Sequence, residues 1–121
     1  MARRIRKTNP VLINLIKELK KKSFENDAPI WKDIAERLER PSKNWAEVNL
    51  DKIEKYVNEN EIALVPGKVL SPGELTKKIT IAACSFSQKA REKIEKAGGR
   101  CVSISELIEE NPKGKNVRII G

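Results

Sequence analysis

The hydrophobic positions in the first part of the chain follow the spacing of helices. Asn9 precedes Pro10, a typical helix start, and apolar residues then recur every three or four positions, which predicts a helix to about Phe24. A second apolar stripe lies between Pro29 and Pro41, where the two prolines would begin and stop a helix. The chain therefore starts with two consecutive short helices.

A third helical stripe includes Leu50 and Ile53 and follows Asn49, which can cap the helix. Trp31 lies within the second stripe, so we expect it to pack in the core. Trp45 lies instead in a polar stretch of turn residues that leads into a brief alternating pattern. There, packing and stacking on a nucleic-acid base both remain open.

In the second half of the chain, short apolar runs separated by turn residues replace the helical stripes. Residues 61–65 and 79–83 predict strands, and Pro66 with Gly67 predicts a turn before the apolar pattern resumes at Val69. The chain thus changes from helical to strand-bearing.

Each later element carries a recognisable start or stop. Ser87 can cap a helix that Gly98 ends, and Ser103 with Glu106 has the spacing of a capping box. Residues 117–120 predict a closing strand. The pattern indicates a mixed α/β fold, with N-terminal helices followed by irregular β-β-α units in a single compact domain.

The domain boundaries follow from this pattern and from the length of the chain. A basic N-terminal tail, residues 1–8, precedes one domain over 9–121, with a helical part 9–60 and a strand/helix part 61–121. A chain of 121 residues has the usual size of one domain and is long enough to bury a core.

The charge is concentrated at the start of the chain. Residues 1–22 carry eight cations and one anion, hence +7 of the net +8, whereas residues 23–121 carry 17 cations against 16 anions. Clustered Lys and Arg displace counterions from a polyanion, which could be RNA, DNA or an anionic membrane. For the lysines, a solvated helix end is the alternative. The eight cations are Arg3, Arg4, Arg6, Lys7, Lys17, Lys20, Lys21 and Lys22, and all except Lys17 are candidate RNA-binding residues.

Composition disfavours several function classes. The chain has no histidine, which removes the commonest general base and metal ligand, and Cys84 and Cys101 have no CxxC partner. We therefore expect no metal, cofactor or small-molecule substrate, and expect both cysteines to be small reduced core residues of a cytosolic protein. No apolar stretch approaches the roughly 20 residues of a spanning helix, so we expect neither export nor a membrane partner.

The fragment VPGKVL invites comparison with a phosphate-binding loop, but it lacks the upstream glycine and the Ser or Thr after the lysine. Lys68 in this fragment could meet one phosphate oxygen beside the predicted turn, or be an ordinary solvated lysine. An aromatic content of 4% disfavours recognition modes that stack several bases.

The two consecutive helices also permit an alternative function, a helix-turn-helix DNA-binding regulator. Its second helix would offer Lys32, Arg37 and Arg40 to base edges, although the link ENDAP holds no glycine. An enzyme that uses carboxylates or cysteine is a third hypothesis.

Seven fragments in one order span nearly the whole chain. They are TNPVLINLIKELK, APIWKDIAERLERP, AEVNLDKI, VPGKVL, the pair Phe86 and Ser87 at a helix start, AGG, and NPKG before VRII. Together they resemble the archaeal and eukaryotic large-subunit ribosomal protein family eighteen-e, which is related in fold to the bacterial large-subunit protein fifteen. The chain ends after VRII without the long extensions of eukaryotic members, so we expect the archaeal form.

The resemblance implies a non-catalytic structural constituent of the large ribosomal subunit, in the cytoplasm, that binds and stabilises folded large-subunit rRNA beside neighbouring ribosomal proteins. It implies RNA contacts for the basic residues before TNP and for the cations of the later fragments. The stretch before AEVNL is basic in the family but thinner here, where Trp45 stands. The further RNA-binding residues implied are Lys43, Lys68, Lys113, Lys115 and Arg118.

Overall fold

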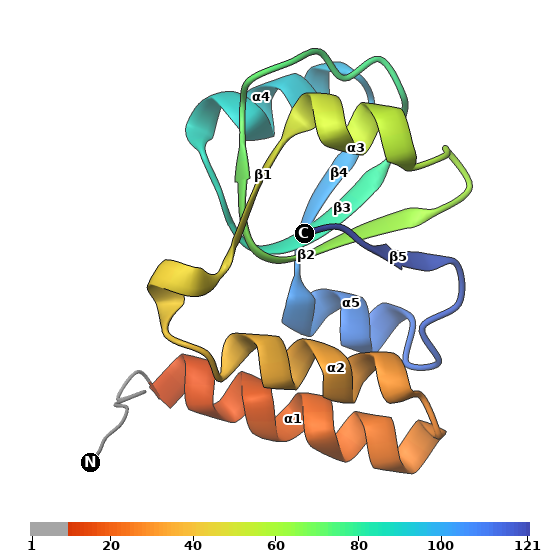
Figure 1. The fold of residues 1–121 in the computed structure, drawn as a ribbon. Helices are drawn as coiled ribbons and strands as arrows, with labels where there is room; N and C mark the ends of the chain where they lie inside the picture. Colours follow the sequence, from red (N-terminus) through yellow and green to blue (C-terminus); the bar gives the residue numbers. More distant parts are fainter. Residues whose placement is uncertain (1–9) are drawn as a thin grey trace.

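A parallel β-sheet with helices on both faces makes up the computed structural model, which describes residues 10–121 (Figure 1). In chain order, the elements are α1 (Pro10–Asn26), α2 (Pro29–Leu38), a 3-10 helix (Ser42–Asn44), β1 (Ala46–Asn49), α3 (Leu50–Tyr56), β2 (Ile62–Leu70), β3 (Thr80–Phe86), α4 (Gln88–Lys96), β4 (Arg100–Ser103), α5 (Ile104–Glu110) and β5 (Val117–Ile119). Helices α3 and α4 cover one face of the sheet, and α2 and α5 cover the other, with α1 outside them.

All strand pairs of the sheet are parallel. The order is β1-β2-β3-β4, while β5 pairs with the start of β2 on the edge that β1 occupies farther along. An irregular segment joins β2 to β3, and helices α4 and α5 then separate the later strands. The predicted mixed α/β class, with helices first and β-β-α order later, is confirmed.

A hydrophobic core lies on each face of the sheet. Ala63 and Val65 of β2 pack on one side, and Leu64 packs on the other, so the strand is apolar on both faces. Trp31 is fully buried in the second core, where its Nε1 donates a hydrogen bond to the Pro112 carbonyl oxygen at 2.7 Å. The packing role predicted for Trp31 is confirmed.

Pro66 and Gly67 do not form the predicted turn, because β2 runs through both residues as one strand. The register between β2 and β3 shifts between Val65 and Lys68, so a bulge accommodates the pair. Strand β1 approaches Gly67 so closely that a Cβ atom there would overlap the Ala46 carbonyl oxygen. The glycine therefore permits strand pairing, a requirement that the dipeptide alone does not reveal.

The predicted caps of the later helices are confirmed. Ser87 Oγ accepts a hydrogen bond from the Ala90 N–H, and Ser103 and Glu106 form a reciprocal capping box. Asn49 is the N-cap of α3, but its side chain makes no capping hydrogen bond. Of the three side-chain caps predicted within residues 10–121, two therefore act through the expected contacts.

Two other expectations are corrected. Strand β1 falls in the part of the chain expected to be helical, because its pairing to β2 is a long-range contact. Cys84 is exposed beside α1, and Cys101 is half-buried on β4, the last strand in the sheet order of residues 10–121. Neither cysteine is a fully buried core residue.

Candidate nucleic-acid interface

The predicted RNA-binding cations of the tail lie outside the described residues. Arg3, Arg4, Arg6 and Lys7 carry +4 of the net charge, and their role stays a prediction. The other eight predicted cations fall into four places: helix α1, a hollow beside β1, the loop before β5, and β5 itself.

The three consecutive lysines of α1 do not form one patch, since successive helix positions are about 100° apart. Lys20 Nζ lies 2.8 Å from Glu39 Oε2, Lys21 Nζ lies 4.0 Å from Glu25 Oε2, and Lys22 is half-buried. Exposed ion pairs of this kind contribute about 0–1 kcal/mol. Lys20 and Lys21 can therefore exchange these partners for a phosphate at little cost.

Lys43 and Lys68, 25 positions apart in the sequence, line the same hollow of about 260 Å³. The strand register places Lys68 beside Glu47 of β1 and Ser85 of β3. Within residues 10–121, neither lysine side chain has a hydrogen-bond or ion-pair partner, and both residues are exposed. We call this the lysine hollow; it is lined by Lys43, Trp45, Ala46, Glu47, Gly67, Lys68 and Ser85.

Two arginines extend the cationic surface around Trp45. Arg37 and Arg40 line a smaller hollow of about 120 Å³ on which Trp45 also borders, and we call it the arginine hollow. From the sequence, these arginines are considered only as base-reading residues of a DNA-binding helix. Their position beside Lys43 is not predicted. The spacing of three between cations 37, 40 and 43 is the signal that could have indicated a shared surface.

The loop before β5 presents Lys113 and Lys115, both exposed. Asn111 holds this loop, because its Oδ1 accepts from the Lys115 N–H at 3.1 Å and its Nδ2 donates to the Lys115 carbonyl oxygen at 2.8 Å. Gly114 has φ +69, which suits glycine. The loop thus presents two cations on a fixed backbone.

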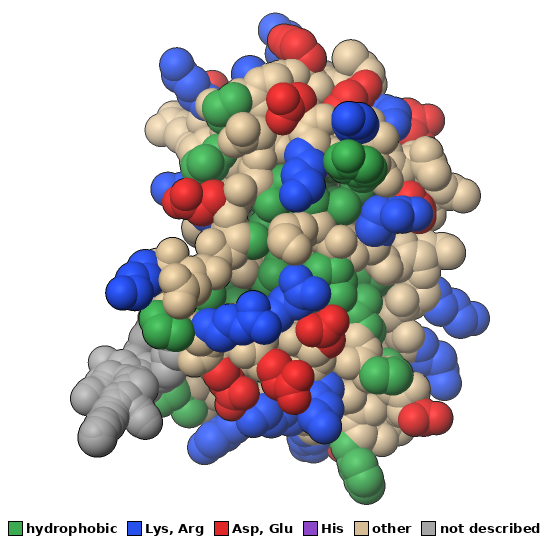
Figure 2. Space-filling model, viewed as in Figure 1, with side chains coloured by type: hydrophobic (Ala, Val, Ile, Leu, Met, Phe, Trp, Pro, Cys, Tyr) green, Lys and Arg blue, Asp and Glu red, His purple; other side chains and the backbone are tan. Residues whose placement is uncertain are grey.

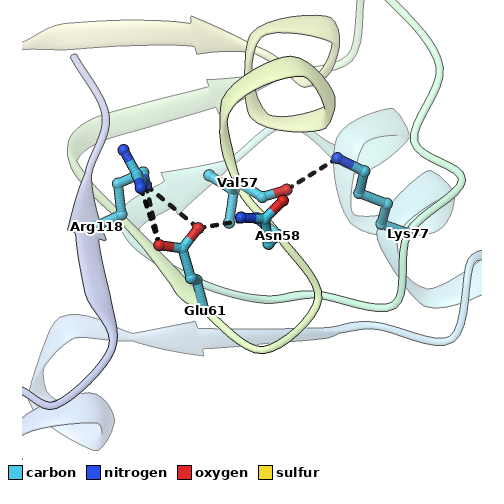
Figure 3. Close-up of polar contacts among 5 residues, drawn as sticks. All are labelled: Val57, Asn58, Glu61, Lys77 and Arg118. Carbon is cyan, nitrogen blue, oxygen red and sulfur yellow. Dashed lines mark hydrogen bonds and ion pairs between the residues drawn. The ribbon is translucent and has the colours of Figure 1, made fainter.

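Arg118 of β5 is held by an acidic partner (Figure 3). Its guanidinium donates to Glu61, with an Nη2–Oε2 distance of 3.0 Å, and Glu61 also accepts from the Asn58 N–H at 2.9 Å. These hydrogen bonds, chiefly that from Arg118, lower the pKa of Glu61, while Glu61 raises the pKa of Arg118. Nearby, Lys77 Nζ donates to the Val57 carbonyl oxygen at 3.1 Å. We call these five residues the Glu61 cluster.

The charge of Arg118 is thus largely compensated within the fold, and its predicted RNA contact remains a prediction. On the face seen in Figure 2, Lys and Arg side chains are interspersed with Asp and Glu side chains around a middle region where hydrophobic side chains are visible. Free cationic charge is therefore a local property of a few places, such as the lysine hollow, rather than of an entire face.

Nucleophilic or metal chemistry finds little support in the described part of the chain. Although Cys84 is exposed as a residue, the surrounding apolar walls desolvate its thiol and raise the pKa of that thiol to about 11, so it stays protonated at neutral pH. Glu110 is engaged by Arg100 at 2.9 Å, and Glu109 is exposed. Residues 10–121 contain no cluster of three or more His, Cys, Asp or Glu that could hold a metal ion. None of the described helices has the length and apolar character to cross a membrane.

The first two helices do not have the arrangement of a helix-turn-helix. They lie side by side as an antiparallel hairpin, joined by Asp27 and Ala28, whereas a DNA-reading pair crosses at about 90–120° (Figure 1). In α2, Arg37 is bonded to Asp33 at 3.0 Å. The geometry therefore disfavours a DNA-recognition helix in α2.

Taken together, the fold and the site define a small parallel α/β protein whose candidate chemistry is the binding of anions by surface cations. The model of one family, the ribosomal proteins that include 50S-L15, 50S-L18e and a 60S counterpart, matches residues 30–102. The chain belongs to this family, which confirms the resemblance found in the sequence.

Individual relatives match over nearly their full lengths. The chain is 54% identical, over 99% of both chains, to large ribosomal subunit protein eL18 of Methanothermobacter thermautotrophicus. It is 53% identical to eL18 of Archaeoglobus fulgidus, over 96% of this chain and 99% of the relative. For eL18 of Methanococcus maripaludis the identity is 49%, over 98% of both chains. These archaeal relatives agree with the archaeal form expected from the sequence.

Proposed function

We propose that this protein is a structural constituent of the large ribosomal subunit that binds and stabilises folded large-subunit rRNA without a chemical step of its own. The observation that carries the proposal is the similarity to relatives named large ribosomal subunit protein eL18, at 54% identity over 99% of both chains. At that coverage the similarity includes the cationic tail as well as the folded domain. The protein accordingly acts in the ribosome, in the cytoplasm.

The binding mechanism is electrostatic. Lys and Arg side chains neutralise phosphates and release condensed counterions, which makes the affinity strongly dependent on salt. The tail supplies four cations within residues 1–8, and the fold adds exposed ones at the lysine hollow and in the loop before β5. The nearly neutral remainder of the domain contributes shape to the fit against folded RNA.

Neighbouring ribosomal proteins are the second class of partner. Three large apolar side chains are exposed among the described residues, with exposed fractions of 90% for Phe24, 76% for Val11 and 51% for Tyr56. Apolar side chains that stand out from a charged surface are suited to contact with another protein. We assign such contacts to the ends of α1 and to α3.

The test compares two variants of the full chain that lose the same charge. One replaces Arg3, Arg4, Arg6 and Lys7 by Gln, and the control replaces Lys52, Lys55, Lys89 and Lys96, exposed residues of α3 and α4. Binding to purified large-subunit rRNA is measured across a salt series. Four lost phosphate contacts should weaken the affinity roughly a thousandfold near 0.1 M salt, and the control should change it much less.

The unmodified protein gives the reference. If about six phosphates are contacted, a fourfold rise in salt should lower its affinity roughly a thousandfold. A nearly flat salt response, equal losses in both variants, or preferential binding to a specific duplex DNA would contradict the proposal.

A further inference from the structure

Trp45 borders three recesses of the surface at once. On one side lies the lysine hollow, on another the arginine hollow, and on a third an apolar groove of about 620 Å³ whose walls include Leu12, Leu15 and Ile104. The groove lies beside β3 and the start of α5, next to α1. Apolar surface and cations therefore meet at a single aromatic ring.

The ring is held in one orientation. Trp45 Nε1 donates a hydrogen bond to the Arg40 carbonyl oxygen at 3.0 Å, and the side chain is half-buried, so part of its surface stays accessible. This environment contrasts with that of Trp31, which is completely enclosed in the core. A fixed, partly exposed indole loses little conformational freedom when another ring stacks on it.

Two of the cations beside Trp45, those of the lysine hollow, are available for a new partner. Within residues 10–121, neither Lys43 nor Lys68 has an ion pair, whereas Lys20, Lys77 and Lys93 all contact carboxylate or carbonyl oxygens. Strand pairing fixes the backbone of Lys68. The lysine hollow thus presents two unengaged ammonium groups on a defined frame.

We propose, resting on the RNA-binding function above, that this place takes one unpaired nucleotide of RNA. Its base lies against Trp45 at the mouth of the apolar groove, and its phosphate lies between Lys43 and Lys68. A nucleotide combines an apolar ring face with an anion, as these recesses require. In a duplex, the faces of the bases are covered by stacking, so duplex RNA would use the lysines and leave the indole unused. A single tryptophan suits one extruded base rather than a run of stacked bases.

The main experiment measures the affinity of the full chain for two RNA probes at fixed low salt: a mixed-sequence single strand of eight nucleotides, and a blunt duplex with the same number of phosphates. Replacing Trp45 by Leu should weaken single-strand binding about tenfold and leave duplex binding unchanged. Trp45→Phe, which keeps a ring, should retain binding within about threefold.

The lysines have their own variant and control. The double substitution Lys43→Gln with Lys68→Gln should lower the slope of log affinity against log salt by about 0.7 for the single strand, since the one phosphate that the two lysines share is no longer neutralised. Lys52→Gln with Lys55→Gln, on α3, removes the same charge away from the residues that line the hollow and should leave that slope unchanged.

A spectroscopic readout avoids dependence on variants. The chain has two tryptophans, so protein labelled with fluorotryptophan gives two fluorine resonances, which the Trp45→Phe spectrum assigns. The single strand should shift the Trp45 resonance and not that of buried Trp31. The blunt duplex, which contacts the lysines and not the ring face, should shift the Trp45 resonance much less than the single strand does.

The outcomes separate this inference from the function on which it rests. If rRNA binding is salt-dependent but Trp45→Leu changes neither probe, or both probes equally, the nucleotide site is refuted and the proposed function stands. The site is also refuted if RNA does not shift the Trp45 resonance while Trp45→Leu prevents incorporation into the large subunit. That combination would mean that the groove holds a protein segment. Absence of any RNA binding by the unmodified protein would overturn both.

Discussion

The Glu61 cluster and the lysine hollow use the same kinds of side chain in opposite ways. In the cluster, Arg118 of β5 contacts the carboxylate of Glu61, directly before β2. Lys77, in the segment before β3, contacts the Val57 carbonyl oxygen at the end of α3, so both charges hold parts of the fold together. In the hollow, Lys43 and Lys68 have no such partner within the described residues. A cation is therefore a candidate for binding RNA when the fold does not already use its charge, and its position in the sequence does not show whether it does.

The largest loss of stability is expected when Lys77 is replaced. Its Nζ donates to the carbonyl oxygens of Glu54 at 2.7 Å and Val57 at 3.1 Å, at the end of α3. Lys77→Ala should lower the free energy of unfolding by about 2 kcal/mol, because hydrogen bonds from a charged donor are lost. Urea denaturation measures this change. The control is Lys78→Ala, at a neighbouring exposed lysine, and it should have little effect. An equal loss of unfolding free energy in both variants would show that the hydrogen bonds of Lys77 do not stabilise the fold.

The next largest effect is expected in the pH dependence of stability, through Glu61 of the Glu61 cluster. The pKa of Glu61 is lowered by its hydrogen bonds with Arg118 and Asn58, so ionised Glu61 stabilises the folded state. A carboxyl group whose pKa is lower in the folded state stabilises the fold at pH values above its unfolded-state pKa, 4.5. This contribution is lost as the pH falls through the folded-state pKa.

Urea denaturation from neutral to acid pH tests this expectation. Glu61→Gln should remove part of the loss of stability at acid pH. An acid profile of Glu61→Gln that matched the unmodified protein would argue against a structural role for the pair.

A smaller effect is expected from the acidic side chain of the hollow. Glu47 is the acidic residue that lines it, and the strand register places it beside Lys68. Glu47→Gln removes a repulsion of RNA phosphates and should raise the affinity for large-subunit rRNA about threefold, measured at low salt. A decrease would mean that Glu47 positions the lysines for binding.

The smallest effect is expected on the free energy of unfolding when the lysines of the hollow are replaced. Lys43→Gln and Lys68→Gln should each alter the free energy of unfolding by less than about 0.5 kcal/mol, since both side chains are exposed and make no polar contact within residues 10–121. Thermal unfolding followed by circular dichroism measures this. A large destabilisation would mean that these two lysines stabilise the fold, as the Glu61 cluster does, and contradict the comparison.

Local signals predicted much of this architecture. The apolar stripe around Trp31 identified a buried helix, and Ser103 with Glu106 identified a helix start, because both patterns depend on contacts within one turn. The order of seven fragments also indicated the family. None of these predictions required knowledge of which strands are neighbours.

The remaining features depend on contacts between distant positions. Pro66 and Gly67 predict a turn by themselves, but the pairing of β1 and β3 on either side keeps them within a strand. Glu61 and Arg118 are 57 positions apart, and the parallel pairing of β2 with β5 brings them together. Local patterning could not separate the bonded Arg118 from the unengaged Lys68.

Local sequence patterns were sufficient to predict the helices, the caps of α4 and α5, the family and the surplus of positive charge, because these are properties of composition and of neighbouring residues. The tertiary structure decided which cations are bonded within the fold and which stand beside Trp45. The physical reason is that charge neutralisation and hollow formation depend on distances across the sheet, which strand register sets.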